Sequence, residues 1–547
     1  MKLSFYQENI LNFFKEHPTE NMYINALAGS GKTSTIIKMT EETKTSDVYI
    51  AFNKSIAEEC KAKIKNPKTK VYTIHSLAYS IMNANLKSSN ESKKGFGSRR
   101  SETINEAKLD NLKIHKIIDD IIIKKLGRYI DFTYKFFLKD NYYNLYNLCR
   151  VTCTDYTNII GIQKLIKDYS LFIDTSDECY TRPSLETITK WLKEIDRISL
   201  NQFEESKLID FTDMLYITFL KLRDKEWEVP YYHYYTNIYI DESQDQNTLQ
   251  LLFLKYIKRK NGRYIFVLDE HQAIYMFAGA NSQACNLIPK LFAPITKFDL
   301  PICYRCPKKH LNRVNQYFKI PIEAREGANE GEIITINKPD IYKYVKAGDM
   351  IISRKNKWFA DVILDLVVHG ISIYIEDVDM VNSILKIVKN LKSSNCYDAK
   401  IELKNQIIKF EKNIKKNINL EEGLSVEEQE KMVKEISSEN TKIDNINFIL
   451  KIIDSYLFKQ SNEMIPIGNF EIYLKKILNC TPNNNSVRIC SIHKAKGLEA
   501  ENVFVLNEAK VERTHRMSVE QLKQEKNLSY IAITRARNCL YLVKEDD

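Results

Sequence analysis

Glycine and proline are scarce in this sequence, with 15 and 12 residues among 547. Their scarcity excludes a collagen-like chain and argues against long flexible linkers. No apolar run reaches the roughly 18 residues that a membrane-spanning helix needs. The first residues carry Lys2 and Glu8 among apolar side chains, which does not fit a secretory signal peptide. We therefore expect a soluble, intracellular protein without a membrane partner, in the cytoplasm or, in a eukaryote, the nucleus.

Cysteine is neither abundant nor even in number, with 11 residues spread along the chain. Such a set does not indicate a disulfide framework. Cys303 and Cys306, with His310, come nearest to a metal motif, but a zinc site needs about four ligands and no second pair is evident. Cys149 and Cys153 have helical spacing. We interpret the cysteines as free thiols.

The chain is basic, with 81 Lys and Arg against 71 Asp and Glu, a net charge of +10. This balance suits a polyanionic partner such as a nucleic acid. The sequence is also rich in Lys, Ile, Asn and Tyr, whose codons are rich in A and T, so base composition alone could supply many of the lysines. Hydrophobic residues make up 44%, enough for several packed cores.

Short apolar runs alternate with helical patterns in two parts of the chain. Runs typical of buried parallel strands occur at 22–26, 47–51, 71–74, 237–240 and 264–268. A second set occurs at 332–336, 349–352, 371–375, 487–491, 503–506 and 540–543. This alternation predicts two α/β domains.

Each α/β pattern is interrupted by a helical stretch that is too long for an ordinary connection. We interpret the two stretches as inserted, mainly helical subdomains. The expected limits are 1–82 with 206–297 for the first α/β domain, 83–205 for its insertion, 298–376 with 485–547 for the second domain, and 377–484 for its insertion.

The clearest motif is ALAGSGKT at residues 26–33, between a predicted strand and a predicted helix. It matches the phosphate-binding loop, with Ala26 in place of the first glycine. Its backbone N–H groups and the positive end of the helix would face phosphate oxygens. Lys32 would reach the β- and γ-phosphates, and the Thr33 hydroxyl would bind Mg²⁺. The predicted nucleotide contacts here are Ala28, Gly29, Ser30, Gly31, Lys32, Thr33 and Ser34.

A second half-site follows in IYIDESQD at residues 238–245. The apolar strand would deliver Asp241 and Glu242 at its carboxyl end, where ligands bind in open α/β sheets. Asp241 would hold Mg²⁺ through water, and Glu242 would orient and deprotonate the attacking water. An isolated Asp-Glu pair is usually a solvated turn, but with the loop at 26–33 it predicts hydrolysis of a nucleoside triphosphate.

Further short motifs indicate which class of nucleotide-hydrolysing protein this is. They are, in chain order, YQ at 6–7, AFNKSIA at 51–57, TIHSL at 73–77, IDFTD at 209–213, VLDEHQAIYMFAGA at 267–280, YR at 304–305, SIHKAKGLE at 491–499 and YIAITRAR at 530–537. With them the chain resembles the UvrD/Rep/PcrA-like DNA helicases of superfamily 1, and FNKSIAE and IHSLA are closest to the F-box helicase subgroup. The resemblance implies two RecA-like parallel-sheet domains with ATP between them, and ATP and Mg²⁺ as cofactors.

The resemblance assigns roles residue by residue. Gln7 is similar to the residue that reads the adenine edge, and Tyr304 to the one that stacks on adenine. Arg305 and Arg535 resemble the arginines that act on the γ-phosphate. Gln272 resembles the γ-phosphate sensor that couples hydrolysis to DNA.

Three further residues match the family less directly. Glu499 resembles a ribose contact, and Asp210 and Phe211 match a short family motif. The chain departs from the family at Leu268, where glycine is usual, and at Ala278, where arginine is frequent. Ala278 in particular puts one strand contact in doubt.

The resemblance also implies contacts to DNA from Phe52, Asn53, His75, Tyr275, Phe277 and His493. Aromatic faces grip any base, at about 1–3 kcal/mol each, without reading sequence. From the residues alone, Tyr275 and Phe277 would be core aromatics of a helix, and a lone histidine is more often structural.

We expect an ATP-dependent helicase that acts as a monomer on single-stranded and forked DNA, with 3′-to-5′ polarity implied by the SIHKAKGLE wording. We expect no F-box in it. The alternatives are a translocase that strips proteins from single strands but unwinds poorly, a DNA-binding scaffold switched by ATP, and an RNA helicase.

Overall fold

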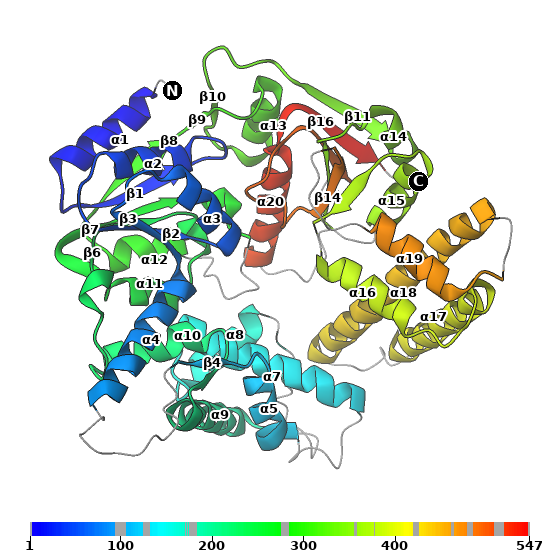
Figure 1. Cartoon of the computed structure of the whole chain (residues 1–547), viewed down its shortest axis with the longest axis horizontal. Helices are drawn as coiled ribbons and strands as arrows, with labels where there is room; N and C mark the ends of the chain where they lie inside the picture. Colours follow the sequence, from blue (N-terminus) through cyan, green and yellow to red (C-terminus); the bar gives the residue numbers. More distant parts are fainter. Residues whose placement is uncertain are drawn as a thin grey trace. The chain divides into compact units, whose positions relative to one another are not determined.

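The structure is a computed structural model of the chain (Figure 1). It describes residues 3–92, 106–123, 132–169, 171, 173, 183–274, 284–354, 358–376, 378–418, 426–460, 464–478, 485–507 and 519–544. The chain divides into two compact units, Met1–Leu300 and Pro301–Asp547. Each unit contains one large parallel sheet and a group of helices inserted into it, so the predicted fold class is confirmed.

The first unit is built on a six-stranded sheet in which every neighbouring pair is parallel. Its strands are, in sheet order, β3 (Thr69–Thr73), β2 (Asp47–Ala51), β6 (Tyr235–Ile240), β7 (Lys258–Leu268), β1 (Asn21–Ala26) and β8 (Ile295–Leu300). The first five overlap the predicted strands, although the one predicted at 71–74 ends a residue earlier, where α4 begins. The sequence pattern missed β8, which pairs with β1 at the sheet edge and lies across the expected domain limit at residue 297.

Helices cover both faces of this sheet because the strand side chains alternate between two apolar cores. Val48 and Ile50 belong to one core, and Tyr49 and Ala51 to the other. One face is covered by α1 (Phe5–Glu16), α2 (Lys32–Glu41) and α3 (Lys54–Lys63). The other is covered by α4 (Ile74–Ser92), α10 (Asp213–Arg223), α11 (Thr248–Leu254) and α12 (Ala284–Leu291).

The predicted helical insertion of the first unit forms between α4 and α10. Its helices are α5 (Lys113–Ile118), the π-helix η1 (Asp119–Ile123), α7 (Phe132–Thr152), α8 (Ile159–Asp168) and α9 (Leu185–Ser206). They lie together around an apolar core of their own (Figure 1). A two-residue strand at each end, β4 (Lys108–Leu109) and β5 (Leu208–Ile209), joins the entry and exit of the insertion.

The second unit repeats the plan with a second six-stranded parallel sheet. Its strands are, in sheet order, β11 (Glu332–Asn337), β16 (Ala536–Lys544), β15 (Ala500–Leu506), β12 (Met350–Ser353), β14 (Val487–Ser491) and β13 (Ile373–Ile375). A short parallel pair, β9 (Ile302–Cys303) and β10 (Glu323–Ala324), precedes it. The accompanying helices are α13 (Lys308–Phe318), α14 (Ile341–Tyr344), α15 (Phe359–Val368) and α20 (Val519–Ile533).

The insertion of the second unit packs differently from that of the first. Its helices are α16 (Val378–Lys389), α17 (Cys396–Ile418), α18 (Val426–Gln460) and α19 (Ile467–Ile477). Their buried side chains share one continuous apolar core with strands of the second sheet. Across the described ranges, no helix is both long enough and apolar enough to cross a membrane.

Candidate active site

The phosphate-binding loop connects β1 to α2 at the carboxyl edge of the first sheet. Gly29 and Gly31 have φ angles of +69° and +83°, in the left-handed region where a side chain is strained. A Cβ atom on Gly31 would also lie 3.1 Å from the amide nitrogen of Gln7. The loop therefore needs glycine at position 31, both for its backbone conformation and for the close approach of Gln7.

Two polar groups of the loop are buried in a way that suits an anionic ligand. Within the described residues, the Ser30 hydroxyl has no hydrogen-bond partner, and the Lys32 ammonium group has no hydrogen bond but forms an ion pair with Glu242. A buried hydroxyl without a partner, such as that of Ser30, costs stability unless a ligand satisfies it. Both groups stand at the amino end of α2, which favours anions. These residues therefore fit the phosphates of a nucleotide.

Glu242 faces this loop from the end of β6. Its carboxylate lies 3.3 Å from the Lys32 ammonium nitrogen. The Glu242 backbone has φ +49°, a conformation that costs a non-glycine residue of the order of 1 kcal/mol or more. Such strain clusters at functional positions, and the strained Glu242 has its carboxylate beside the loop.

Asp241 is placed for a metal ion beside Thr33. Its carboxylate accepts hydrogen bonds from the Thr33 hydroxyl at 3.3 Å and from the Tyr49 hydroxyl at 2.6 Å. Burial and the neighbouring Glu242 charge raise the pKa of Asp241, against the opposing effect of Lys32. No cluster of three or more His, Cys, Asp or Glu side chains that could hold a metal ion occurs in the described parts of the chain. The Thr33–Asp241 pair fits Mg²⁺, which usually keeps waters and phosphate oxygens as further ligands.

A chain of hydrogen bonds links Glu242 to Gln272, and the sequence motifs alone did not reveal it. The Gln244 side-chain amide donates to Glu242, and its oxygen accepts from the Asp269 backbone N–H at 3.1 Å. The Gln272 amide in turn donates to the Asp269 carboxylate at 2.6 Å. Gln244, Asp269 and Gln272 are all buried. The predicted base and the predicted sensor are therefore joined through two intermediate residues.

Gln7 lies against the same loop. Its amide nitrogen donates to the Thr35 hydroxyl at 2.9 Å, and the Thr35 hydroxyl donates to the Gly31 carbonyl at 2.9 Å. Its amide oxygen accepts from the Ser4 backbone N–H at 3.1 Å, in a capping box that starts α1. A glutamine amide has two N–H groups and two oxygen lone pairs, so these bonds leave capacity for an adenine edge.

In the second unit, Arg305 and Arg535 meet at Thr534. Arg305 donates to the Thr534 carbonyl at 3.3 Å and pairs with Glu499. Arg535 is buried, and its guanidinium donates to the carbonyls of Ile531 and Leu498 at 3.0 and 3.2 Å and to the Thr534 hydroxyl at 3.0 Å. The structure thus places the two predicted arginines side by side.

The Glu499 carboxylate pairs with two arginines of this unit. It binds Arg305 and also Arg537. Burial raises its pKa, but the charges of the two arginines and their hydrogen bonds outweigh burial and leave the pKa lowered. Tyr304 precedes Arg305 and is half-buried. The predicted adenine, ribose and phosphate contacts of the second unit therefore lie in neighbouring segments of that unit.

The residues predicted to contact a DNA strand have different surroundings in the structure. Asn53 caps α3, where its side chain accepts from the Ile56 backbone N–H at 2.9 Å, and Phe52 precedes it at the end of β2. In the second unit, burial and then the charge of Arg354 lower the pKa of His493 to about 4, so its imidazole is neutral at pH 7. Tyr275 and Phe277 lie outside the described residues.

His75 has an aromatic partner that was not predicted as a strand contact. The Phe211 ring stacks on the His75 ring with centroids 4.3 Å apart, and Phe211 is 55% exposed. Burial lowers the pKa of His75 to about 4 against the opposing charge of Asp210. The sequence indicated Phe211 only as part of a short family motif. Its exposed ring could not be predicted, because exposure cannot be read from the sequence.

Among the described residues, Cys303, Cys306 and His310 belong to no group of three or more possible metal ligands. The two cysteines are buried free thiols, as predicted, and the Cys306 backbone N–H donates to the Cys303 sulfur at 3.3 Å. His310 has its Nε2 atom 2.9 Å from the Glu332 carbonyl oxygen. The other ring nitrogen of His310, Nδ1, is buried and has no hydrogen-bond partner among the described residues.

The comparison with known proteins agrees with this geometry. The UvrD/REP helicase N-terminal domain family matches residues 7–293, and the UvrD-like helicase C-terminal domain family matches residues 486–543. The first match alone covers more than half of the chain and contains both halves of the nucleotide site. The chain belongs to the UvrD/Rep helicase family.

Individual relatives of this UvrD/Rep-family chain are distant. The F-box DNA helicase protein 1 of Schizosaccharomyces pombe is 22% identical over 96% of the chain and 56% of its own length. The ATP-dependent DNA helicase Rep of Buchnera aphidicola subsp. Schizaphis graminum is 22% identical over 62% of the chain and 66% of its own length. A probable DNA helicase II homolog of Mycoplasma capricolum is 21% identical over 65% and 62%. The chain thus spans somewhat more than half, but less than two thirds, of the length of these relatives.

Proposed function

We propose that the protein is an ATP-dependent DNA helicase and single-strand translocase that moves in the 3′-to-5′ direction. Four side chains at the carboxyl edge of the first sheet carry this proposal, together with the family membership. Lys32 and Thr33 come from the loop after β1, and Asp241 and Glu242 come from the end of β6. Lys32 lies 3.3 Å from Glu242, and Thr33 lies 3.3 Å from Asp241. These are the kinds of group that hydrolysis of a nucleoside triphosphate needs.

In this proposal Lys32 leaves Glu242 and binds the β- and γ-phosphates of ATP, helped by the Ser30 hydroxyl and the loop backbone. Glu242 then orients the attacking water and accepts its proton at a carboxylate oxygen. Thr33 and Asp241 would hold Mg²⁺, which would neutralise charge on the phosphates. Through Gln244 and Asp269, Gln272 reports the state of the site.

The remaining nucleotide contacts follow the predicted roles. Gln7 reads the adenine edge, Tyr304 stacks on the base and Glu499 binds the ribose. Arg305 and Arg535 stabilise the charge that develops on the transferred phosphoryl group. In the described state both arginines are held by other groups, so these roles require them to exchange partners.

For the strand, we propose contacts from Phe52, Asn53, His75, Phe211, Tyr275, Phe277 and His493. The exposed face of Phe211 supports this proposal in the first unit, because a ring held flat on a neutral imidazole offers a base a ready stacking surface. The net charge of +10 favours the same polyanionic partner. The substrate would be single-stranded and forked DNA, and the protein would act as a monomer.

Phosphate release measured with and without single-stranded DNA tests this function against its alternatives. We expect strong stimulation by DNA and little by RNA of the same sequence. A scaffold that ATP only switches would show no stimulated turnover, and an RNA helicase would prefer the RNA. Displacement of streptavidin from a biotinylated single strand, compared with separation of a duplex, distinguishes a protein-stripping translocase from a helicase.

A further inference from the structure

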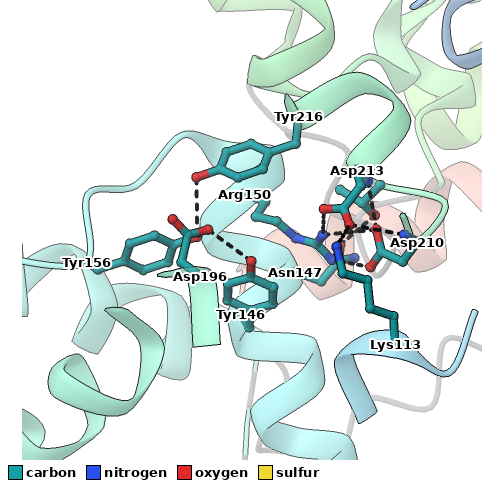
Figure 2. Close-up of polar contacts among 10 residues, drawn as sticks. Lys113, Tyr146, Asn147, Arg150, Tyr156, Asp196, Asp210, Asp213 and Tyr216 are labelled. Atoms are coloured by element: carbon teal, nitrogen blue, oxygen red, sulfur yellow. Dashed lines mark hydrogen bonds and ion pairs between the residues drawn. The ribbon is translucent and has the colours of Figure 1, made fainter. Parts of the chain in front are cut away.

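A cluster of buried charges fastens the inserted helices of the first unit to the segment that carries Phe211 (Figure 2). Arg150 of α7 donates to both carboxylate oxygens of Asp210, at 3.0 and 2.7 Å, and to Asp213 at 2.8 Å. Lys113 of α5 donates to the other oxygen of Asp213 at 2.7 Å. All four side chains are at most 3% exposed. Two cations and two carboxylates balance in charge, as buried ions must.

The same segment has further ties to the insertion and to itself. The Thr212 hydroxyl donates to the Asn147 side-chain oxygen at 2.8 Å. The backbone N–H groups of Asp210 and Asp213 each donate to the carboxylate of the other, at 3.0 and 2.7 Å. The side chains of Asp210, Thr212 and Asp213 therefore bind the insertion or the backbone of their own turn. Phe211 differs from them, since it is 55% exposed and rests on His75.

Arg150 is itself fixed from its other side. Its guanidinium lies 4.5 Å from the centre of the Tyr146 ring. The Tyr146 hydroxyl donates to Asp196 at 2.9 Å, and the Tyr156 hydroxyl donates to the same carboxylate at 3.1 Å (Figure 2). Asp196 belongs to α9, so α7 and α9 hold the guanidinium in place.

We propose that Arg150 and Lys113 are positioning residues for strand binding, which hold the Asp210–Asp213 turn so that the Phe211 ring stays on His75 and faces the bases of a single strand. This inference rests on the proposed function. A ring that is already ordered loses little freedom when a base stacks on it, so its grip on the strand is tighter. The plain alternative is that the cluster only attaches the insertion to the first unit.

The decisive experiment is a double-mutant cycle in affinity for a single-stranded oligodeoxynucleotide, with Arg150→Lys, Phe211→Ala and the double variant of the full chain. Arg150→Lys keeps the positive charge but loses the bidentate hydrogen bonds to Asp210. We expect Phe211→Ala to weaken binding about 5- to 150-fold. Arg150→Lys should weaken it at least about twofold and leave the salt dependence of binding unchanged. In the double variant, Arg150→Lys should add nothing to the loss caused by Phe211→Ala.

A matched pair on α5 supplies an independent comparison and covers the case in which Arg150→Lys does not fold. Lys113→Met and Lys116→Met each remove one positive charge from this helix, but Lys116 is 64% exposed and pairs only with Asp110 among the described residues. We expect Lys113→Met to weaken strand binding more than Lys116→Met. Melting temperatures recorded on all variants show how far the fold itself is affected.

The outcomes separate this inference from the proposed function. If the parent binds the strand but Arg150→Lys binds equally well, or if its loss adds fully to that of Phe211→Ala, the cluster only supports the fold and the inference is overturned. Equal effects of Lys113→Met and Lys116→Met overturn it too. A parent chain that does not bind single-stranded DNA overturns the proposed function, and the inference with it.

Discussion

The ammonium nitrogen of Lys32 lies 3.3 Å from a carboxylate oxygen of Glu242, and both side chains are largely buried. One residue begins the helix after the phosphate-binding loop, and the other follows a strand two places away in the same sheet. The fold thus pairs the group that would hold the phosphates with the group that would activate water. In the proposed function Lys32 leaves Glu242 when a nucleotide binds, and each residue can be tested by its own substitution.

Lys32→Ala should abolish ATP hydrolysis while most binding of single-stranded DNA remains. Lys32 supplies the positive side-chain charge of the loop, whereas the proposed strand contacts lie on other segments. Phosphate release and oligonucleotide binding measure the two effects. Lys38→Ala is the matched control, because Lys38 lies on the same helix but its side chain is 45% exposed and pairs with Glu41 at 2.6 Å. Near-normal turnover of Lys32→Ala would show that the nucleotide site is wrongly assigned.

Glu242→Gln should still bind ATP but hydrolyse it about 10²- to 10⁴-fold more slowly. Glutamine keeps the size of the side chain and can still accept from Gln244, but it cannot take a proton from water. Nucleotide binding and single-turnover hydrolysis separate the two properties. Glu41→Gln, an exposed change on α2, serves as the control. Hydrolysis at the parental rate would mean that another residue is the base.

Gln244→Leu tests the hydrogen-bond chain from Glu242 to Gln272. The substitution removes a donor to a carboxylate and leaves the Asp269 backbone N–H without its Gln244 acceptor. A hydrogen bond to a charged group is worth about 1.5–3 kcal/mol, so kcat should fall about 10- to 150-fold, and stimulation by DNA should shrink. Gln250→Leu, which removes part of the α11 capping box, should lower the melting temperature with little change in kcat. Equal kcat values for the two variants would contradict a role for the chain in turnover.

The structure also predicts how pH affects stability through His75. The pKa of this histidine falls from an ordinary 6.5 to about 4 in the folded protein, mainly because of burial. The unfolded chain therefore binds the extra proton first, and the stabilisation present above pH 6.5 is lost as the pH falls toward 4. The loss is about 1.4 kcal/mol per pH unit for one proton. The melting temperature without DNA should fall less steeply over this range in His75→Asn than in the parent. Identical slopes would show that His75 is solvated in the folded chain.

Much of the fold could be predicted because buried parallel strands leave a strong pattern. All eleven predicted strands are present, since strands covered on both faces form continuous apolar runs. β8 was missed because it lies at the sheet edge, where Lys297 and Asp299 face solvent and break the apolar run. The insertions were predicted from their length and composition, but the sequence gives no sign that the second one shares its core with the sheet.

The candidate site was predictable where one motif carries several functional groups. The loop at 26–33 and the strand end at 241–242 lie together, with Lys32 3.3 Å from Glu242 and Thr33 3.3 Å from Asp241, while their contacts to a nucleotide and Mg²⁺ stay predictions. The chain through Gln244 and Asp269, and the ties of Arg150 to Asp210, join segments far apart in sequence. Such pairings depend on tertiary packing, and no spacing rule in a single sequence indicates them.

The central claim, ATP-driven unwinding with 3′-to-5′ polarity, is tested most directly by strand separation on two duplexes of equal sequence that carry a single-stranded tail on either the 3′ or the 5′ side. We expect the parent to separate the 3′-tailed duplex in the presence of ATP and Mg²⁺, and to leave the 5′-tailed duplex intact. Neither duplex should separate with Lys32→Ala or with a non-hydrolysable ATP analogue. Separation of the 5′-tailed duplex alone would contradict the polarity, and separation of neither by an actively hydrolysing parent would contradict the helicase itself.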